Sequence, residues 1–92
     1  MKLKRDDNFT YHLEQIILYI ADDSKTRARN FRNKLQKQLS SLENFPYKFR
    51  KSIYFDDDNI RDYIFMGYTI PYLVDKANDT IVVLDIFKWD KR

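Results

Sequence analysis

Six basic side chains lie between Ser24 and Leu42 of this 92-residue chain, and no acidic side chain interrupts them. They are Lys25, Arg27, Arg29, Arg32, Lys34 and Lys37. A block of lysine and arginine attracts an anionic partner, either nucleic acid or an acidic protein. The same block also suits the solvated face of an amphipathic helix. Both interpretations stay open on the residue types alone.

Other kinds of site chemistry are limited by the composition. The chain has no cysteine and one histidine, His12, which excludes disulfides, thiolate metal sites, a cysteine nucleophile and a histidine-rich metal site. The acidic run at 56–58 lacks the spaced ligands and the turn glycine of a calcium loop, so we interpret it as a solvated loop. We expect no metal and no cofactor.

The length and composition indicate one folded domain, residues 1–92. A chain of this size buries a single core, and its 43% apolar and 16% aromatic residues can fill one. No apolar run approaches the roughly 20 residues of a membrane-spanning helix. We therefore expect a soluble cytoplasmic protein without a membrane partner.

Two amphipathic helices are predicted in the first half of the chain. Asp6, Asp7 and Asn8 are candidate N-caps of the first helix, and Ser24 is the candidate cap of the second. Each helix carries one apolar stripe on the helical period. The first stripe is Phe9, Leu13, Ile16, Ile17 and Ile20; the second is Ala28, Phe31, Leu35, Leu39 and Leu42. All six basic residues fall off the second stripe, so we predict a helical hairpin with a basic outer side. Pro46 ends the helical part.

The second half of the chain has the composition of strands and turns. Predicted strands are Ile53–Phe55, Ile60–Phe65, Tyr68–Val74 and Thr80–Phe87, and residues 1–5 are a possible edge strand. The three main runs, those after Ile53–Phe55, are joined by short connections, which favours an antiparallel meander. The prediction is an α+β fold of order β-α-α-β-β-β, with the helical hairpin packed on an antiparallel sheet.

Two residues affect the predicted strand Tyr68–Val74, one just before it and one inside it. Gly67, the only glycine, is predicted in a tight turn, where a left-handed backbone costs glycine little. Pro71 cannot donate a hydrogen bond to a neighbouring strand, which indicates an edge, a bulge or an interruption. For a central strand we predict a bulge.

Nearly the whole chain resembles the RelE/ParE superfamily, the toxins of bacterial type II toxin–antitoxin modules. The resemblance rests on "YIA" in the first helix, a small residue and then Phe in the second, and "L-x-x-x-P" at its exit. It continues with an arginine opening a strand in "IRDYIFMGYTIPYLVD", the "GY" of the next strand, and the apolar strand with a basic end in "TIVVLDIFKWDKR". The family fold is the same β-α-α-β-β-β arrangement.

The resemblance implies a toxin that arrests growth and is neutralised by a cognate antitoxin. RelE-like members are endoribonucleases that cut mRNA on the ribosome, whereas ParE-like members generally inhibit DNA gyrase as binding proteins. "DIFKWDKR" has no histidine or tyrosine where the nucleases often carry one, and Lys88 stands where many relatives have histidine. The sequence therefore resembles the ParE-like branch more closely, and whether it is an enzyme stays open.

In the nuclease alternative, cleavage needs a proton acceptor, stabilisation of the phosphate and a proton donor. Basic residues that could supply these roles are Arg61, Lys51, Lys88 and Arg92, with Lys48, Arg50 and Lys91 nearby in sequence. Arg61 could grip a phosphate and Trp89 could stack on a base. Alternatively, Arg61 pairs with Asp58 or Asp62 and Trp89 caps the core. His12 is interpreted as a partly exposed helix residue.

Antitoxin binding is predicted from charge. Family antitoxins are typically acidic in the segment that wraps the toxin, and the basic outer side of the second helix would speed its association. The predicted antitoxin- or target-binding residues are Arg27, Arg29, Arg32, Lys34, Lys48, Arg50 and Trp89.

Overall fold

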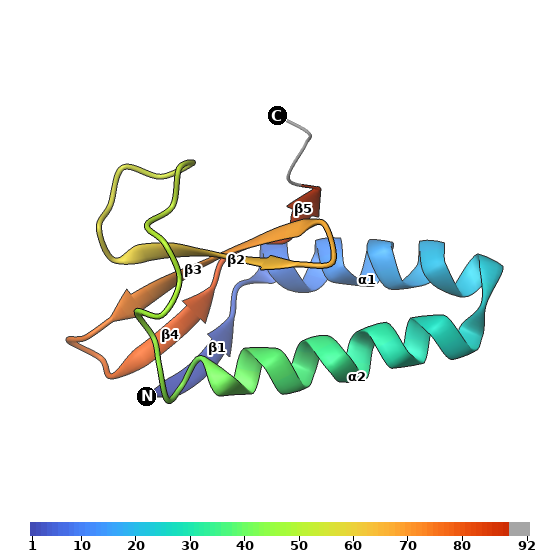
Figure 1. Ribbon diagram of the computed structural model, residues 1–92, viewed down its shortest axis with the longest axis horizontal. Coiled ribbons are helices and arrows are strands. Elements are labelled where there is room, and N and C mark those ends of the chain that lie inside the picture. Colours follow the sequence, from blue (N-terminus) through green and yellow to red (C-terminus); the bar gives the residue numbers. More distant parts are fainter. Residues whose placement is uncertain (89–92) are drawn as a thin grey trace.

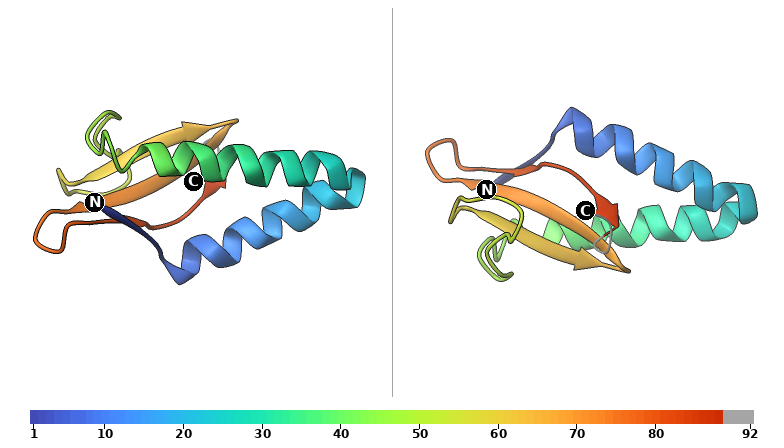
Figure 2. Two further views of the ribbon diagram at one scale, coloured as in Figure 1. Left: turned by 90° about the horizontal axis from the view of Figure 1, so that it is seen from below. Right: turned by 90° about the horizontal axis from the view of Figure 1, so that it is seen from above.

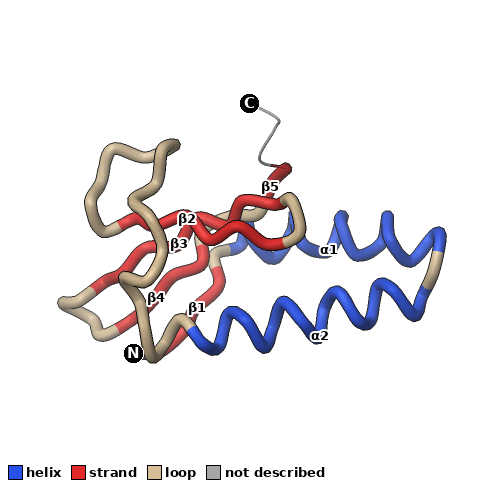
Figure 3. The backbone as a smooth tube through the Cα atoms, viewed as in Figure 1, coloured by secondary structure: helices blue, strands red, loops and turns tan. Residues whose placement is uncertain are grey.

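The computed structural model describes residues 1–88 of the chain. Trp89, Lys91 and Arg92 therefore lie outside the described residues. Two helices and five strands follow each other in the order shown in Figures 1 and 3. Their bounds are β1 Lys2–Arg5, α1 Asp7–Asp23, α2 Lys25–Ser41, β2 Ile60–Phe65, β3 Tyr68–Asp75, β4 Thr80–Val83 and β5 Phe87–Lys88.

Both helices begin at the predicted caps. The Asp6 carboxylate accepts a hydrogen bond of 2.9 Å from the backbone N–H of Asn8. The Ser24 hydroxyl oxygen accepts one of 3.1 Å from the N–H of Arg27. Ser24 is also the C-cap of α1, since its N–H donates to the carbonyl of Ile20. One residue therefore separates the two helices, and the helical hairpin is tight.

The apolar stripes of the two helices face the sheet. All five predicted stripe residues of α2 are buried, as are Phe9, Leu13 and Ile17 of α1, while Ile16 and Ile20 pack partly buried against the same core. The sheet contributes alternate residues, among them Ile70, Tyr72 and Val74, as expected for a strand with one face on the core. The tip of the hairpin extends beyond the end of the sheet (Figure 2).

The strand order in the sheet is β1-β4-β3-β2, and β5 also pairs with β3. β2, β3 and β4 form the predicted antiparallel meander. β1 pairs with β4 in parallel, with Leu3 opposite Ile81. β4 is the third strand of the meander, and it runs in the same direction as β1. The sheet is therefore mixed rather than entirely antiparallel.

Pro71 causes an interruption instead of the predicted bulge. β2 and β3 stay in continuous register through Pro71, which lies opposite Asp62. On its other side β3 pairs with β4 from Tyr72 onward and with β5 at Tyr68 and Thr69. The Pro71 carbonyl faces this second side and accepts from the N–H of Leu84 at 2.9 Å. Because N and C=O of one strand residue point to the same side, the missing N–H falls in the gap between β4 and β5.

The same gap divides the predicted strand Thr80–Phe87 into β4 and β5. The predicted strand Ile53–Phe55 is wrong as well, because these residues form bends in a loop. The backbone of this loop is fastened to β2 just before them: Ser52 N–H donates to the Ile60 carbonyl at 2.8 Å, and Lys51 forms an isolated bridge with Arg61. The N–H of Ile53 then turns to the side chain of Asp62 at 3.1 Å, which ends the pairing.

Gly67 occupies the predicted tight turn between β2 and β3. Its φ is 85°, and that of the preceding Met66 is 49°. Positive φ at both central residues is the pattern of the hairpin turn that matches strand twist and usually carries Asn-Gly. The turn holds Met66, an apolar residue in an unfavourable conformation, out into solvent.

Candidate functional site

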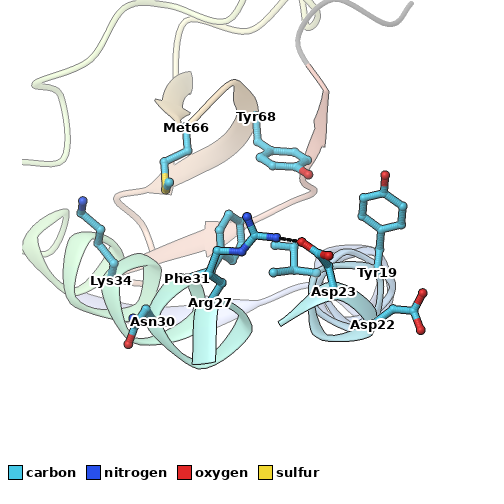
Figure 4. Close-up of a pocket in the computed structure, with 10 residues that line it drawn as sticks. Tyr19, Asp22, Asp23, Arg27, Asn30, Phe31, Lys34, Met66 and Tyr68 are labelled. Carbon is cyan, nitrogen blue, oxygen red and sulfur yellow. Dashed lines mark hydrogen bonds and ion pairs between the residues drawn. The ribbon is translucent and has the colours of Figure 1, made fainter. Parts of the chain in front are cut away.

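A groove of about 670 Å³ lies between the helical hairpin and the β2–β3 turn (Figure 4). We call it the hairpin groove. Its lining comes from the end of α1, the first half of α2 and the turn: Tyr19, Ile20, Asp22, Asp23, Arg27, Asn30, Phe31, Lys34, Met66 and Tyr68. It exists because the hairpin tip and the turn both extend past the body of the sheet.

The floor of the hairpin groove is aromatic. Phe31 is buried and packs edge-on against Phe65, with ring centroids 5.3 Å apart, and against Tyr68, at 5.8 Å. At the rim, Tyr19 is 80% exposed and Met66 is 63% exposed. Large apolar side chains that frame a hollow in this way favour a protein partner with apolar anchors.

The charges of the hairpin groove lie on its helical wall. Arg27 pairs with Asp23 one turn earlier in sequence, and Figure 4 shows this pair above the helix ends. Lys34 lies two turns after Arg27 on the same wall and has no ion-pair partner within residues 1–88. Asp22 also lines the groove and likewise makes no ion pair within residues 1–88. The groove therefore has one unpaired cation, Lys34, and one unpaired acid, Asp22, beside an apolar floor.

A second groove, of about 580 Å³, continues from the first along α1 and β5. Both grooves are lined by Tyr19 and Tyr68. In the second groove His12 Nδ1 lies 2.7 Å from a carboxylate oxygen of Asp85, which ties α1 to the segment between β4 and β5. Lys88 Nζ lies over the Tyr68 ring, 4.9 Å from its centroid. His12 is thus a half-exposed helix residue, as predicted, with a link to the sheet.

Arg61 lies away from both grooves, at the start of β2. Its guanidinium donates a hydrogen bond of 3.1 Å to the Phe49 carbonyl and stacks over the Tyr47 ring, 4.8 Å from the centroid. Its Nε is buried without a hydrogen-bond partner among the described residues. Arg61 therefore fastens the segment after α2 to the sheet, and only part of its side chain reaches solvent.

The predicted pairing of Arg61 with Asp58 or Asp62 is not present in the described residues. Asp58 pairs instead with Lys51, at 3.2 Å. Asp62 is 1% exposed and accepts from the N–H of Ile53, with Arg50 3.8 Å away. The two acids flank Arg61 in sequence, but strand alternation turns Asp62 to the opposite face of the sheet.

Tyr72, the residue opposite Arg61 on β3, is fully buried. Its hydroxyl donates to the Pro46 carbonyl at 2.7 Å. Burial raises the pKa of Tyr72 to about 12, although the nearby Arg61 acts in the opposite direction. A tyrosine with this pKa holds its proton at neutral pH, and its hydrogen bond to Pro46 supports the loop after α2.

The described residues of the predicted nuclease set do not converge. Arg61 lies opposite Tyr72, and Lys88 lies opposite Tyr68. Tyr68 and Tyr72 are four residues apart on β3, a separation of about 13 Å at about 3.3 Å per residue. Lys51 neighbours Arg61 but is paired with Asp58. Lys48 lies over the ring of its neighbour Phe49, and Arg92 lies outside the described residues.

The six basic residues of α2 are all exposed, as predicted, but they point in different directions. Arg27 and Lys34 line the hairpin groove. Arg32 reaches across to α1 and lies 3.8 Å from Glu14. Arg29 lies on neither groove. The predicted binding residues of this helix therefore belong to two separate surfaces.

Neither the exposed rim of the hairpin groove nor the tyrosines around Arg61 could be recognised as site residues from the sequence. Tyr19 lies off the apolar stripe of the first helix, and Met66 lies in a turn. A large apolar residue at a position that cannot reach the core was the signal in the sequence that could have identified both. Tyr47 and Tyr72 had no such signal, because their contacts join parts of the chain that are distant in sequence.

Two further observations concern the described part of the chain. Among residues 1–88 no group of three His, Asp or Glu side chains is placed to hold a metal ion. No helix in this part of the chain has the length and apolarity needed to cross a membrane.

A family model, the ParE toxin of the type II toxin–antitoxin system parDE, matches residues 3–90. This chain therefore belongs to the ParE toxin family: it is the toxin of a type II toxin–antitoxin system and has a cognate antitoxin as its partner. A search of curated proteins found no match.

Two solved structures show the same fold. The chromosomal ParDE toxin–antitoxin system from P. aeruginosa matches with a TM-score of 0.75 at 16% identity, covering 96% of this chain and 95% of that one. The isolated E. coli RelE toxin matches with a TM-score of 0.69, also at 16% identity, covering 99% and 86%. These likenesses bear out the predicted RelE/ParE fold.

Proposed function

We propose that this toxin acts as a binding protein that inhibits DNA gyrase, in the manner of the ParE-like branch, and not as a ribosome-dependent nuclease. The observation that carries the proposal is the arrangement around Arg61. The arginine that a nuclease would present to a phosphate is half-buried and engaged with Phe49 and Tyr47, and Lys88 lies at the other end of β3. General acid–base catalysis needs its groups within hydrogen-bonding reach of one reacting centre.

Two assays run side by side test this proposal. Purified toxin is added to a gyrase supercoiling reaction, and the same preparation is added to a translation reaction in which mRNA cleavage is mapped. We expect supercoiling to be blocked and mRNA to stay intact. Cleavage of mRNA on translating ribosomes, lost in Lys51→Ala or Lys88→Ala toxin, would favour the nuclease instead. Both substitutions change exposed side chains, so loss of folding does not complicate the result.

We also propose that the antitoxin is held in the hairpin groove. An apolar segment with acidic residues fits this groove, because Phe31, Tyr19 and Met66 offer an apolar surface and Lys34 offers an unpaired positive charge. Apolar anchors supply most of the affinity of such interfaces, and rim charges mainly speed association.

Lys34→Glu is the matching test, with Lys37→Glu as its control. Lys37 belongs to the same helix and is also exposed, but it does not line the groove. We expect Lys34→Glu to weaken antitoxin binding about five- to tenfold at low salt and to reduce its salt dependence. Equal effects of the two reversals would show that net charge, and not the groove, determines binding.

A further inference from the structure

The helical hairpin has a second exposed face, which turns away from both grooves. On α1 a line of residues spaced four, three and four apart runs along the side opposite the buried stripe: Asp7, Tyr11, Glu14 and Leu18. Tyr11 is 63% exposed and Leu18 is 61% exposed. The core side of α1 is already filled by Phe9, Leu13 and Ile17, so this row of acid and apolar residues lies outside the core. Within residues 1–88, Tyr11 has an edge-on ring contact with its neighbour His12 and Glu14 lies near Arg32 of α2, while Leu18 is left to solvent.

The neighbouring strip on α2 has the opposite charge. Lys25, Arg29 and Arg32 are spaced four and three apart, which places them on one side of the helix. Glu14 and Arg32 lie 3.8 Å apart, so the two strips meet along the seam between the helices. We call the combined surface the outer hairpin face. It consists of an acidic and apolar row beside a basic row.

From this pattern we infer that the outer hairpin face binds a second copy of this chain. A surface with an acidic row next to a parallel basic row is complementary to itself when one copy is rotated about a two-fold axis that runs along the helices. That rotation places α1 of each copy on α2 of the other. Each residue keeps its position along the helix axis, so residues that are neighbours across one hairpin also face each other across the interface. Glu14 then lies level with Arg32 of both copies, and Leu18 and Tyr11 are covered by the partner's α2.

The alternative two-fold axis, perpendicular to the helices, would stack α1 on α1. That arrangement reverses the order of residues along each helix, so Glu14 and Arg32, which lie near the middle of α1 and α2, come close to Glu14 and Arg32 of the other copy. Like charges in direct contact are unfavourable. The charge pattern therefore selects one of the two symmetric arrangements, an isologous pair of hairpins forming four helices.

The size of the face indicates a weak dimer. Each 17-residue helix is about 25 Å long at 1.5 Å per residue, and two helices about 9 Å apart present a width of roughly 20 Å. The footprint is about 500 Å² per copy, or roughly 1,000 Å² in total, at the lower limit for a specific interface. The dimer leaves the hairpin groove open, so it does not depend on the function proposed above.

Sedimentation of the full chain across protein concentration tests the inference. We expect dimers to form at tens of micromolar in about 50 mM salt and to weaken at least fivefold in about 500 mM salt, where charges are screened. Leu18→Glu should make the protein monomeric throughout this range. Ile64→Glu is the control, because Ile64 is 44% exposed on the sheet, and it should leave the dimer intact.

A charge swap distinguishes a specific interface from general attraction. Arg32→Glu should abolish the dimer, and the double variant Glu14→Arg with Arg32→Glu should restore it. Circular dichroism on each variant confirms that the helices are retained. The inference is overturned if the parent stays monomeric at low salt, if Leu18→Glu dimerises as well as Ile64→Glu, or if the double swap fails to recover the dimer.

Discussion

Replacement of Arg61 by alanine should destabilise the fold, and this separates a structural arginine from a catalytic one. The substitution removes a hydrogen bond from a charged donor to the Phe49 carbonyl, worth about 1.5–3 kcal/mol, and the stacking on Tyr47, worth about 0.5–1 kcal/mol. It also removes the buried, unpartnered Nε, which returns roughly 1 kcal/mol. The expected net loss is about 2 kcal/mol in the free energy of unfolding.

Urea denaturation and thermal melting measure this loss directly. For a domain of this size about 2 kcal/mol corresponds to a fall of roughly 10 °C in melting temperature. Arg29→Ala is the matched control, because Arg29 is exposed and makes no ion pair within residues 1–88, and it should change stability by less than about 0.5 kcal/mol. An Arg61→Ala protein as stable as the control, yet inactive, would refute the structural role and favour catalysis.

Further substitutions test the turn, the loop contact and the helix cap. Gly67→Val should lower the free energy of unfolding by about 1–2 kcal/mol, because φ is 85°, although the added Cβ meets nothing within 4 Å; an unchanged urea midpoint would exclude this turn. Tyr72→Phe should lower it by about 1–2 kcal/mol at neutral pH, because the Pro46 carbonyl loses its partner. Because burial raises the pKa of Tyr72 to about 12, the parent should also lose stability as pH rises from about 10 to 12, and the Phe variant should lose less across that interval. Ser24→Ala should cost about 1 kcal/mol and Ser24→Asp much less, as thermal melting can verify, and equal melting temperatures for the two would contradict the capping role.

The helical half of the fold could be predicted almost completely from the sequence. Caps and apolar stripes are local signals, and Ser24 and the stripe of α2 carry them clearly. The meander and the turn at Gly67 were also predicted, because turn residues and strand composition are local too. The predicted bulge at Pro71 was wrong. Pro71 is accommodated because β3 pairs with β5 before it and with β4 after it, and no residue near Pro71 in the sequence indicates this change of partner strand.

The candidate site was predicted less well, for the same reason. Exposure of the basic residues on α2 follows from their positions off the apolar stripe, but their division between the hairpin groove and the outer hairpin face depends on where the sheet lies. Arg61 was identified as important, yet its partners Phe49 and Tyr47 come from a loop without regular structure. Contacts of this kind cannot be read from spacing or periodicity.

The most direct test of the central claim is a supercoiling assay in which the antitoxin is titrated against the purified toxin and gyrase. We expect the toxin to block supercoiling and the antitoxin to restore it, with Lys34→Glu toxin requiring more antitoxin than Lys37→Glu toxin for the same recovery. Supercoiling that proceeds unchanged at every toxin concentration, together with cleavage of mRNA on translating ribosomes, would contradict the account.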